Sequence, residues 1–300
     1  MIDQIPWFPS FHKPSIKAKM MHPMHNLITR QKGMILEDTY DLLKSRYKRQ
    51  IGKLTISDAR IGIYLTAVRL SDNSFGTSST IPDDQPFCLK SNRDFGDFTP
   101  LKIRGKKVLD IIETKNGTAI LSSLRIAVLN AMSSKIISAG NYRIIEDCDP
   151  IQLLDLSSRK TITIVGAFHS YIRKISSTAN KLFVLERNKE ALASEYKKFF
   201  VEAEEYKTVL PLSDIVIITG QTLVNGTIDD LLQAISPGTQ VIVTGPSGSI
   251  IPDILFENGV SIIGASRITK PDILFDIVSD GGTGFHLFEY CARKICILKI

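Results

Sequence analysis

The sequence has few cysteines, no long apolar run and no dense block of charge. Its four cysteines are Cys88, Cys148, Cys291 and Cys296. They show no C-x-x-C spacing, which favours free thiols in a reducing cytoplasm over a zinc ribbon. No run of about 18 apolar residues is present, so we expect no membrane span. The first residues lack an apolar segment followed by a small-residue cleavage site, so we expect no signal peptide.

The positive charge is spread along the chain rather than gathered in one place. The formal net charge is +6, and its densest cluster, Lys44–Arg49, ends a helical pattern, where cations suit the helix dipole. We therefore expect no nucleic-acid partner. Whether the chain forms a homo-oligomer is left open by the sequence.

The signatures of several well-known sites are also missing. No G-x-G-x-x-G fingerprint is present, and no Gly-Lys-Ser or Gly-Lys-Thr follows Gly245–Gly248, so the sequence has no P-loop. No G-x-S-x-G nucleophile elbow appears with partners in a convincing order. His169 and His286 stand far apart without zinc-ligand spacing, so we interpret each as a structural or surface histidine.

The length of the chain suits two domains, preceded by an extension. Residues 1–33 contain four prolines and no amphipathic period, so we predict a poorly ordered extension. Residues 34–145 begin with a helical pattern at Met34 and predict an α+β domain. Its expected strands are 54–58, 61–70 and 75–80, and its later helices are 108–113 and 118–137.

Residues 146–300 show a different pattern, in which short apolar strands alternate with helices. This alternation predicts an α/β domain with a doubly wound parallel sheet and right-handed crossovers. The expected strands are 161–165, 182–185, 214–218, 240–243 and 261–263. The expected helices are 170–177, 188–198, 228–235, 252–258 and 271–278.

The stretch from Asp214 to Phe256 indicates where a ligand binds. The runs Ile215–Ile218 and Gln240–Val243 have no polar alternation, which is typical of strands buried on both faces. Each run ends in a loop of small and hydroxylated residues. Ligands of open α/β sheets bind outside the carboxyl ends of the strands, so we expect these two loops to lie side by side on the ligand-binding edge.

The hydroxyl and amide groups of these loops are open to two interpretations. Such loops suit anions or carboxylates near helix starts, but threonine and asparagine are also common helix caps and turn residues. The candidates in the first loop are Thr219, Gly220, Thr222 and Asn225. The candidates in the second are Gly245, Pro246 and Ser247.

A second group of candidates follows the first two strands of residues 146–300. Gly166 and Phe168 come after the first strand, and Glu186 ends the next one. An acidic residue about 20 positions after a strand-end glycine is what a nucleotide ribose requires in Rossmann-type domains. This spacing supports an alternative function, an enzyme that uses an adenosine-containing cofactor, such as a methyltransferase or an oxidoreductase. Glu186 is equally interpreted as a solvated strand-end carboxylate.

Motifs in both halves resemble one known family. The run Ser213–Thr227, with the motif Thr-Gly-Gln-Thr-Leu-Val-Asn, and the following Gly245-Pro246-Ser247 resemble the prokaryotic "putative heavy-metal chelation" domain family. Asp58–Val68 is similar to the strand motif of that family, and Ala127–Ala131 to its helix motif. The resemblance implies an enolase-N-terminal-like α+β domain followed by a Rossmann-like domain.

The resemblance also implies a ligand-binding cleft between the two domains. We expect heavy-metal chelation, or the binding or processing of a metal-related small molecule. The ligand would be a metal ion or a metal chelate, and no known reaction is implied. The cleft would be lined by Glu186, Thr219, Thr222, Asn225 and Ser247, with Thr66 and Asn130 facing it. Oxygen donors of these types favour hard ions or an organic chelator over bare soft metals.

Overall fold

The computed structural model describes residues 34–81, 96–115 and 117–299. Residues Met34–Ile300 form one compact unit, to which the following description applies. The predicted extension over residues 1–33 lies outside the described residues, as does Cys88. The predicted helix at Met34 is present as α1 (Ile35–Tyr47), with Glu37 and Asp38 in its first turn.

A three-stranded antiparallel sheet follows α1 in the chain. Its strands are β1 (Ile56–Ile61), β2 (Leu65–Leu70) and β3 (Phe75–Ser79). The prediction of one strand over residues 61–70 was wrong, because the chain turns at Gly62. The Gly62 amide donates to the Leu65 carbonyl at 2.9 Å, and a β-carbon on Gly62 would lie 2.2 Å from the Val278 carbonyl oxygen.

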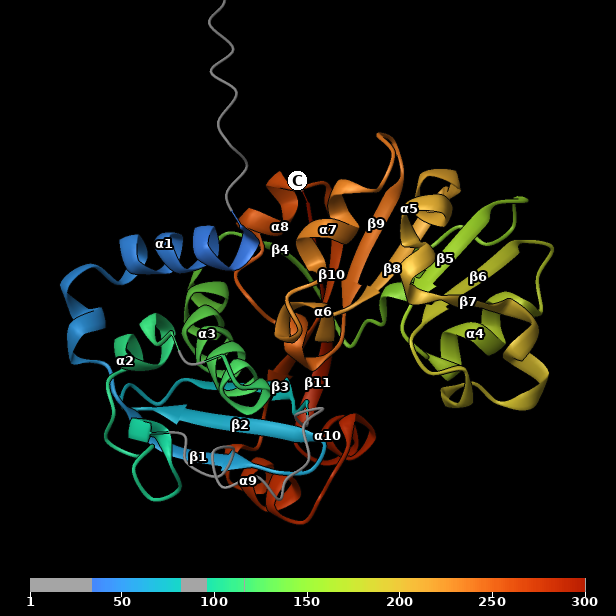
Figure 1. Ribbon diagram of the computed structural model, residues 1–300. Helices are drawn as coiled ribbons and strands as arrows, with labels where there is room; N and C mark the ends of the chain where they lie inside the picture. The colour runs from blue at the N-terminus through green and yellow to red at the C-terminus, as the bar shows by residue number, and fades with distance from the viewer. Residues whose placement is uncertain (1–33, 82–95, 116, 300) are drawn as a thin grey trace, which may run out of the picture. The chain divides into compact units, whose positions relative to one another are not determined.

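Helices cover both faces of this small sheet (Figure 1). After the short α2 (Val108–Glu113), the helix α3 (Ala119–Ala139) packs on one face. It approaches β3 so closely that a β-carbon on Gly76 would lie 2.2 Å from the Ala127 carbonyl oxygen. The other face packs against α9 (Pro271–Ser279) and α10 (Gly284–Tyr290). The C-terminal part of the chain therefore completes the packing of the N-terminal sheet.

The composition of α3 is explained by this position. It is long and apolar enough to cross a membrane by length and composition, and 67% of the apolar window is buried inside the fold. Among the described residues, no other helix meets these criteria. The same apolar side chains form the largest core cluster together with residues of α1 and of the second sheet.

The second sheet has eight strands in the order β4-β11-β10-β9-β8-β5-β6-β7. Six of them, β5 to β10, run parallel, whereas β11 is antiparallel to β10 and β4 is antiparallel to β11. The predicted parallel sheet is therefore a mixed sheet, and the fold is mixed α/β. The strands are β4 (Arg143–Glu146), β5 (Thr161–Val165), β6 (Lys181–Glu186), β7 (Phe200–Glu202), β8 (Ile215–Thr219), β9 (Gln240–Thr244), β10 (Val260–Ile268) and β11 (Ala292–Leu298).

The order of these strands reverses at β5. From β5 the chain adds β6 and β7 on one side, and then returns to add β8, β9 and β10 on the other side. Both faces of the central strands are buried, since Ile215 and Ile217 belong to one core cluster whereas Val216 and Ile218 belong to another. This double burial explains why the strand sequences show no polar alternation.

Helices cover both faces of the large sheet. The helix α4 (His169–Ser176) belongs to the cluster on one face. The short helices on the other face are α6 (Gln221–Val224), α7 (Ile228–Gln233) and α8 (Asp253–Glu257). The predicted helix over residues 188–198 was wrong: two short 3-10 turns, Lys189–Ala191 and Ser194–Phe199, occupy this segment, and α5 (Tyr206–Val209) follows β7.

Candidate functional site

Gly166 stands directly after β5, at the point where the strand order reverses. Its φ angle is 102°, a conformation that favours glycine. A β-carbon there would lie 3.2 Å from Thr219 Cγ2, and the Gly166 amide donates to the Leu185 carbonyl at 2.9 Å. Gly166 therefore allows the ends of β5, β6 and β8 to pack closely.

A pocket of about 470 Å³ lies at these strand ends. Five predicted site residues line it, namely Gly166, Glu186, Thr219, Thr222 and Asn225. Ile81, which follows the small sheet, contributes to the same wall. We call this space the switch-point pocket, because ligands of open α/β sheets bind where the strand order reverses.

Negative side chains dominate the lining of the switch-point pocket. Among the described residues that line it, Glu186, Glu204 and Asp230 are acidic, and Arg187 is the one cation. The remaining polar groups are neutral hydroxyls and amides, and the apolar wall includes Val165. A cleft lined by one sign of charge with apolar walls focuses the electrostatic field, so this pocket favours a cationic ligand.

The carboxylate of Glu186 has both a structural role and a free oxygen. Its Oε1 accepts hydrogen bonds from the amides of Arg187 at 2.8 Å and Asn188 at 3.2 Å, which stabilise the turn after β6. Among the described residues, the structure records no partner for Oε2. The two interpretations of Glu186 are therefore compatible, because one oxygen supports the turn and the other can accept from a ligand.

The polar side chains of the loop after β8 mainly stabilise the loop itself. The Thr222 hydroxyl donates to the Thr219 carbonyl at 2.7 Å. Asn225 Oδ1 accepts from the amide of Thr227 at 3.2 Å and from its hydroxyl at 2.7 Å. These bonds fit the interpretation as turn and cap residues, and they fix the wall of the pocket.

The loops after β8 and β9 lie side by side, as predicted. The Gly220 amide donates to the Thr244 carbonyl at 2.7 Å. A β-carbon on Gly220 would lie 2.4 Å from the Gly248 amide nitrogen, so the two backbones are in direct contact. Gly220 is therefore a packing residue, and it is not among the residues that line the switch-point pocket.

Three other candidates connect elements inside the core. Ser247 Oγ accepts from the Ser79 amide at 2.7 Å, which links β3 to the loop after β9. Asn130 Nδ2 contacts the carbonyls of Thr77, Pro246 and Ser247 at 2.7, 3.2 and 3.2 Å. The Thr66 hydroxyl is buried and bonds to that of Thr80 at 2.8 Å. None of these three residues lines the switch-point pocket.

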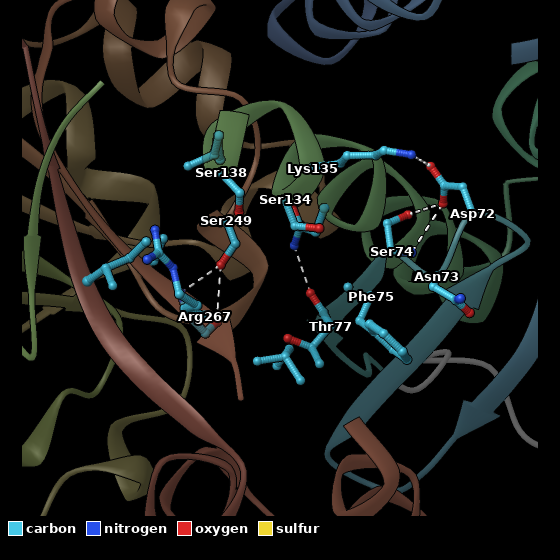
Figure 2. A pocket seen from close by; sticks show the side chains of 17 residues that line it. Asp72, Asn73, Ser74, Phe75, Thr77, Ser134, Lys135, Ser138, Ser249 and Arg267 are labelled. Atoms are coloured by element: carbon cyan, nitrogen blue, oxygen red, sulfur yellow. Dashed lines mark hydrogen bonds and ion pairs between the residues drawn. The ribbon is translucent and has the colours of Figure 1, made fainter. Parts of the chain in front are cut away.

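Asn130 instead lines a second pocket, of about 260 Å³, which Figure 2 shows from close by. Lys135 pairs with Asp72 at 3.0 Å on one side of it, and Arg267 lies on the opposite side, where it pairs with Glu146 at 2.5 Å. The cations of this pocket are thus already neutralised by carboxylates. Asn130 Oδ1 is buried and has no partner among the described residues.

A third pocket, of about 470 Å³, contains the candidates Phe168, Gly245 and Pro246. Its polar centre is Asp149, whose carboxylate accepts from the Tyr171 hydroxyl and pairs with Lys294 at 2.7 Å. Burial, the bond to Asp149 and its charge raise the pKa of Tyr171. Sequence reasoning missed this network because its members lie as far as 145 positions apart and no local pattern connects them.

Both halves of the chain match family models. Residues 149–297 match the DUF364 model and residues 44–133 match the DUF4213 model, and both models are described as "putative heavy-metal chelation". Together these ranges span most of the chain. The chain belongs to this family. Among curated proteins, none matches it.

Solved structures of DUF364 proteins share the fold. A DUF364 protein of unknown function from Pyrococcus horikoshii has a TM-score of 0.71 at 21% identity, with coverage of 89% of this chain and all of the other. Another from Desulfitobacterium hafniense has a TM-score of 0.64 at 18% identity, with coverage of 86% of this chain and all of the other. At these identities the likeness shows the fold alone.

The side chains of this DUF364 protein do not fit a bare metal ion held by three or more ligands. In the described ranges, no group of three or more His, Cys, Asp or Glu side chains is placed to hold an ion. Structural zinc sites need four protein ligands and catalytic ones need three. A metal in the switch-point pocket would therefore have to bring most of its ligands with it.

Proposed function

We propose that this DUF364 protein binds a metal-related small molecule, a metal chelate with a net positive charge, in the switch-point pocket. The observation that carries the proposal is the pocket of about 470 Å³ at the ends of β5, β6 and β8, whose described lining residues include three carboxylates and one guanidinium. Neutral oxygens from Thr219 and Asn225 suit the polar surface of such a complex better than they suit a bare soft ion.

A finer description of the two halves supports the position of the pocket. The strands β7-β6-β5-β8-β9-β10 correspond to the order 3-2-1-4-5-6 when they are numbered along the chain, which is the order of Rossmann-type sheets. We infer a Rossmann-like second half on this basis. The enolase-N-terminal-like first half and the domain boundary after residue 145 stay predictions; β4 (Arg143–Glu146) crosses that boundary.

The proposal predicts binding of complexes and not of free ions. Isothermal titration calorimetry on the full chain would compare Ni²⁺ and Co²⁺ alone with the same ions as one-to-one histidine complexes, which carry a net positive charge. We expect heat and saturation only with the complexes. Free ions that bind as tightly as the complexes would contradict the proposal.

Charge variants then locate the binding site. Glu186→Gln keeps the size of the side chain but removes its charge, so we expect the affinity for a cationic complex to fall about 10-fold, the effect of losing one charge-assisted hydrogen bond. Glu195→Gln, at an exposed position outside the pocket lining, is the matched control and should bind normally. Equal effects of both variants would place the binding elsewhere.

The same titration also tests the alternative function, an enzyme that uses an adenosine-containing cofactor. S-adenosylmethionine and NAD would be included as contrasting ligands, since Gly166 and Glu186 also suit a ribose. Saturable binding of either cofactor, together with no response to any metal complex, would replace the proposal by the cofactor-dependent enzyme. Cytoplasmic location, the absence of nucleic-acid and membrane partners, and the oligomeric state stay predictions.

A further inference from the structure

Two buried cysteines meet at the edge of the large sheet. Cys296 lies in β11, and Cys148 comes two residues after β4, the neighbouring strand. The Cys296 thiol donates to the Cys148 carbonyl at 3.2 Å, and it is also within hydrogen-bonding reach of the Cys148 side chain. Both thiols are free. Cys148 itself lies in the segment after β4, and its amide holds this segment against β11 by donating to the Lys294 carbonyl at 3.3 Å.

The two thiols are buried among apolar side chains, with the ion pair of Asp149 and Lys294 on the side of the third pocket. Cys296 is fully buried and Cys148 is 5% exposed, in one core cluster with Ile162, Ile164 and Ile262. Burial raises the pKa of the Cys296 thiol, and the adjacent Cys148 side chain raises it further. The Cys296 sulfur is therefore expected to carry a proton in the absence of a ligand that displaces it.

An entry path leads to this pair from the third pocket. Cys148 is one of the residues that line that pocket, with Asp149, Tyr171 and Lys294 beside it. A small ion in that pocket would lie beside Cys148, and the Cys296 thiol lies against the Cys148 carbonyl. The Lys294 ammonium, paired with Asp149 at 2.7 Å, lies at the same edge.

We propose that Cys148 and Cys296 form a two-coordinate site for a thiophilic d¹⁰ cation, with the mercuric ion as the best match. Soft thiolates select soft ions. Zinc requires additional ligands, and within the described ranges no third metal-binding side chain joins the pair. The mercuric ion is satisfied by two sulfurs in a line.

The charge balance of the site favours a divalent ion. Binding breaks two S–H bonds, forms two S–metal bonds and releases two protons to solvent. Two thiolates and one divalent cation make a neutral complex, which an apolar cluster accepts at low cost, whereas a monovalent ion would leave one uncompensated negative charge in the core. The site does not depend on the function proposed for the switch-point pocket, because none of its residues line that pocket.

The test uses the full chain with the other two cysteines removed, as Cys88→Ser and Cys291→Ser. The reduced protein, freed of reductant without oxygen, would receive one equivalent of mercuric chloride in the presence of excess glutathione. We expect one ion per chain by native mass spectrometry, the loss of two titratable thiols, and a linear two-sulfur environment by X-ray absorption at the mercury edge.

Single variants in the same background separate a two-sulfur site from an ordinary reactive thiol. Cys148→Ser and Cys296→Ser should each lower the retention of mercury against glutathione by about 100-fold or more, because the second sulfur acts at a high effective concentration. Unchanged retention in either variant, or the loss of only one thiol per ion, would overturn the proposal.

A measurement on the unaltered chain avoids any effect of these substitutions on folding. Crystals of the wild-type protein soaked with mercuric chloride would show the ion by its anomalous scattering. A peak between the Cys148 and Cys296 sulfurs supports the site. A peak bonded to one of these sulfurs alone, or to neither, would overturn it.

Discussion

Single glycines set the geometry of the strand ends around the switch-point pocket, and they do so for different reasons. Gly166 is needed for its positive φ of 102° and for the approach of Thr219. Gly220 has an ordinary φ of −58°, but a β-carbon on it would lie 2.4 Å from the Gly248 backbone. Gly226 has a positive φ of 74° and open space around it. We therefore expect alanine substitutions at these glycines to lower the free energy of unfolding by different amounts.

We expect Gly220→Ala to lower the free energy of unfolding by about 3 kcal/mol, the upper range for overpacking a core, because backbone on both sides prevents relaxation. Gly226→Ala adds only backbone strain, so we expect a cost of about 1 kcal/mol. Chemical denaturation of both variants measures the difference. If Gly220→Ala cost no more than Gly226→Ala, the close contact of the two loops would be wrong.

At the scale of elements, α3 is tied to the large sheet through one buried amide. Asn130 on α3 donates to the Thr77 carbonyl in the middle of β3 and to carbonyls of the loop after β9. Its removal leaves buried acceptors without a donor, so we expect Asn130→Ala to lower the free energy of unfolding by about 2–3 kcal/mol.

Ser134→Ala is the matched control for this prediction. Ser134 lies one turn further along α3 and lines the same pocket, but its hydroxyl bonds only to the Ala131 carbonyl of its own helix. We expect a change within about 0.5 kcal/mol. Urea denaturation curves that coincide for the two variants would show that the Asn130 amide does not connect the elements.

The elements that could be predicted from sequence are those with a strong local pattern. The central strands β5, β6, β8 and β9 were predicted because double burial produces runs of β-branched residues. The strand β11 was missed because it carries the exposed charges Arg293 and Lys294 and depends on pairing with β4 and β10. The helix predicted over 188–198 fails because the Asn188 side chain caps a 3-10 turn and Leu192 is buried in an extended conformation.

Residues of the candidate site were likewise predicted only where a local sequence pattern marks them. Gly166, Glu186, Thr219, Thr222 and Asn225 were predicted because they end strands or follow them, and strand ends meet at one edge of the sheet. The acidic residues Glu204 and Asp230 were missed because they come from segments without a motif. Asn130 and Ser247 were assigned to the same cleft, whereas the structure uses them as links inside the core.

At the scale of the whole molecule, stability should depend on pH in the alkaline range. Burial raises the pKa of the Cys291 thiol from 9.0 to about 11, and Cys296 shifts in the same direction. Below pH of about 9 the folded and unfolded states both hold these protons. Above it the unfolded state loses them first, so stability falls as pH rises, by about 1.4 kcal/mol per pH unit for each thiol.

Guanidinium denaturation between pH of about 8 and 10 would measure this slope. Ordinary tyrosines, with a pKa of about 10, contribute equally to the wild-type chain and to a cysteine variant, so the difference between the two isolates the thiol. Cys291→Ala should remove the contribution of one thiol, about 1.4 kcal/mol in total over this interval, because the thiol of the unfolded state titrates near its centre. If Cys291→Ala left the pH dependence of the unfolding free energy unchanged, the Cys291 thiol would have the same pKa in the folded and unfolded states.

The cover of the small sheet by α9 and α10 has a consequence for synthesis on the ribosome. Leu65 and Ala67 emerge about 200 residues before the helices that bury them. At a translation rate of 5–20 residues per second, this interval lasts roughly 10–40 s. During that time the nascent chain presents an apolar sheet face to its surroundings, and β4 has no neighbour until β11 is made. Chaperone binding to the nascent chain should therefore be strong in this interval and end once α9, α10 and β11 are free to pack on these elements.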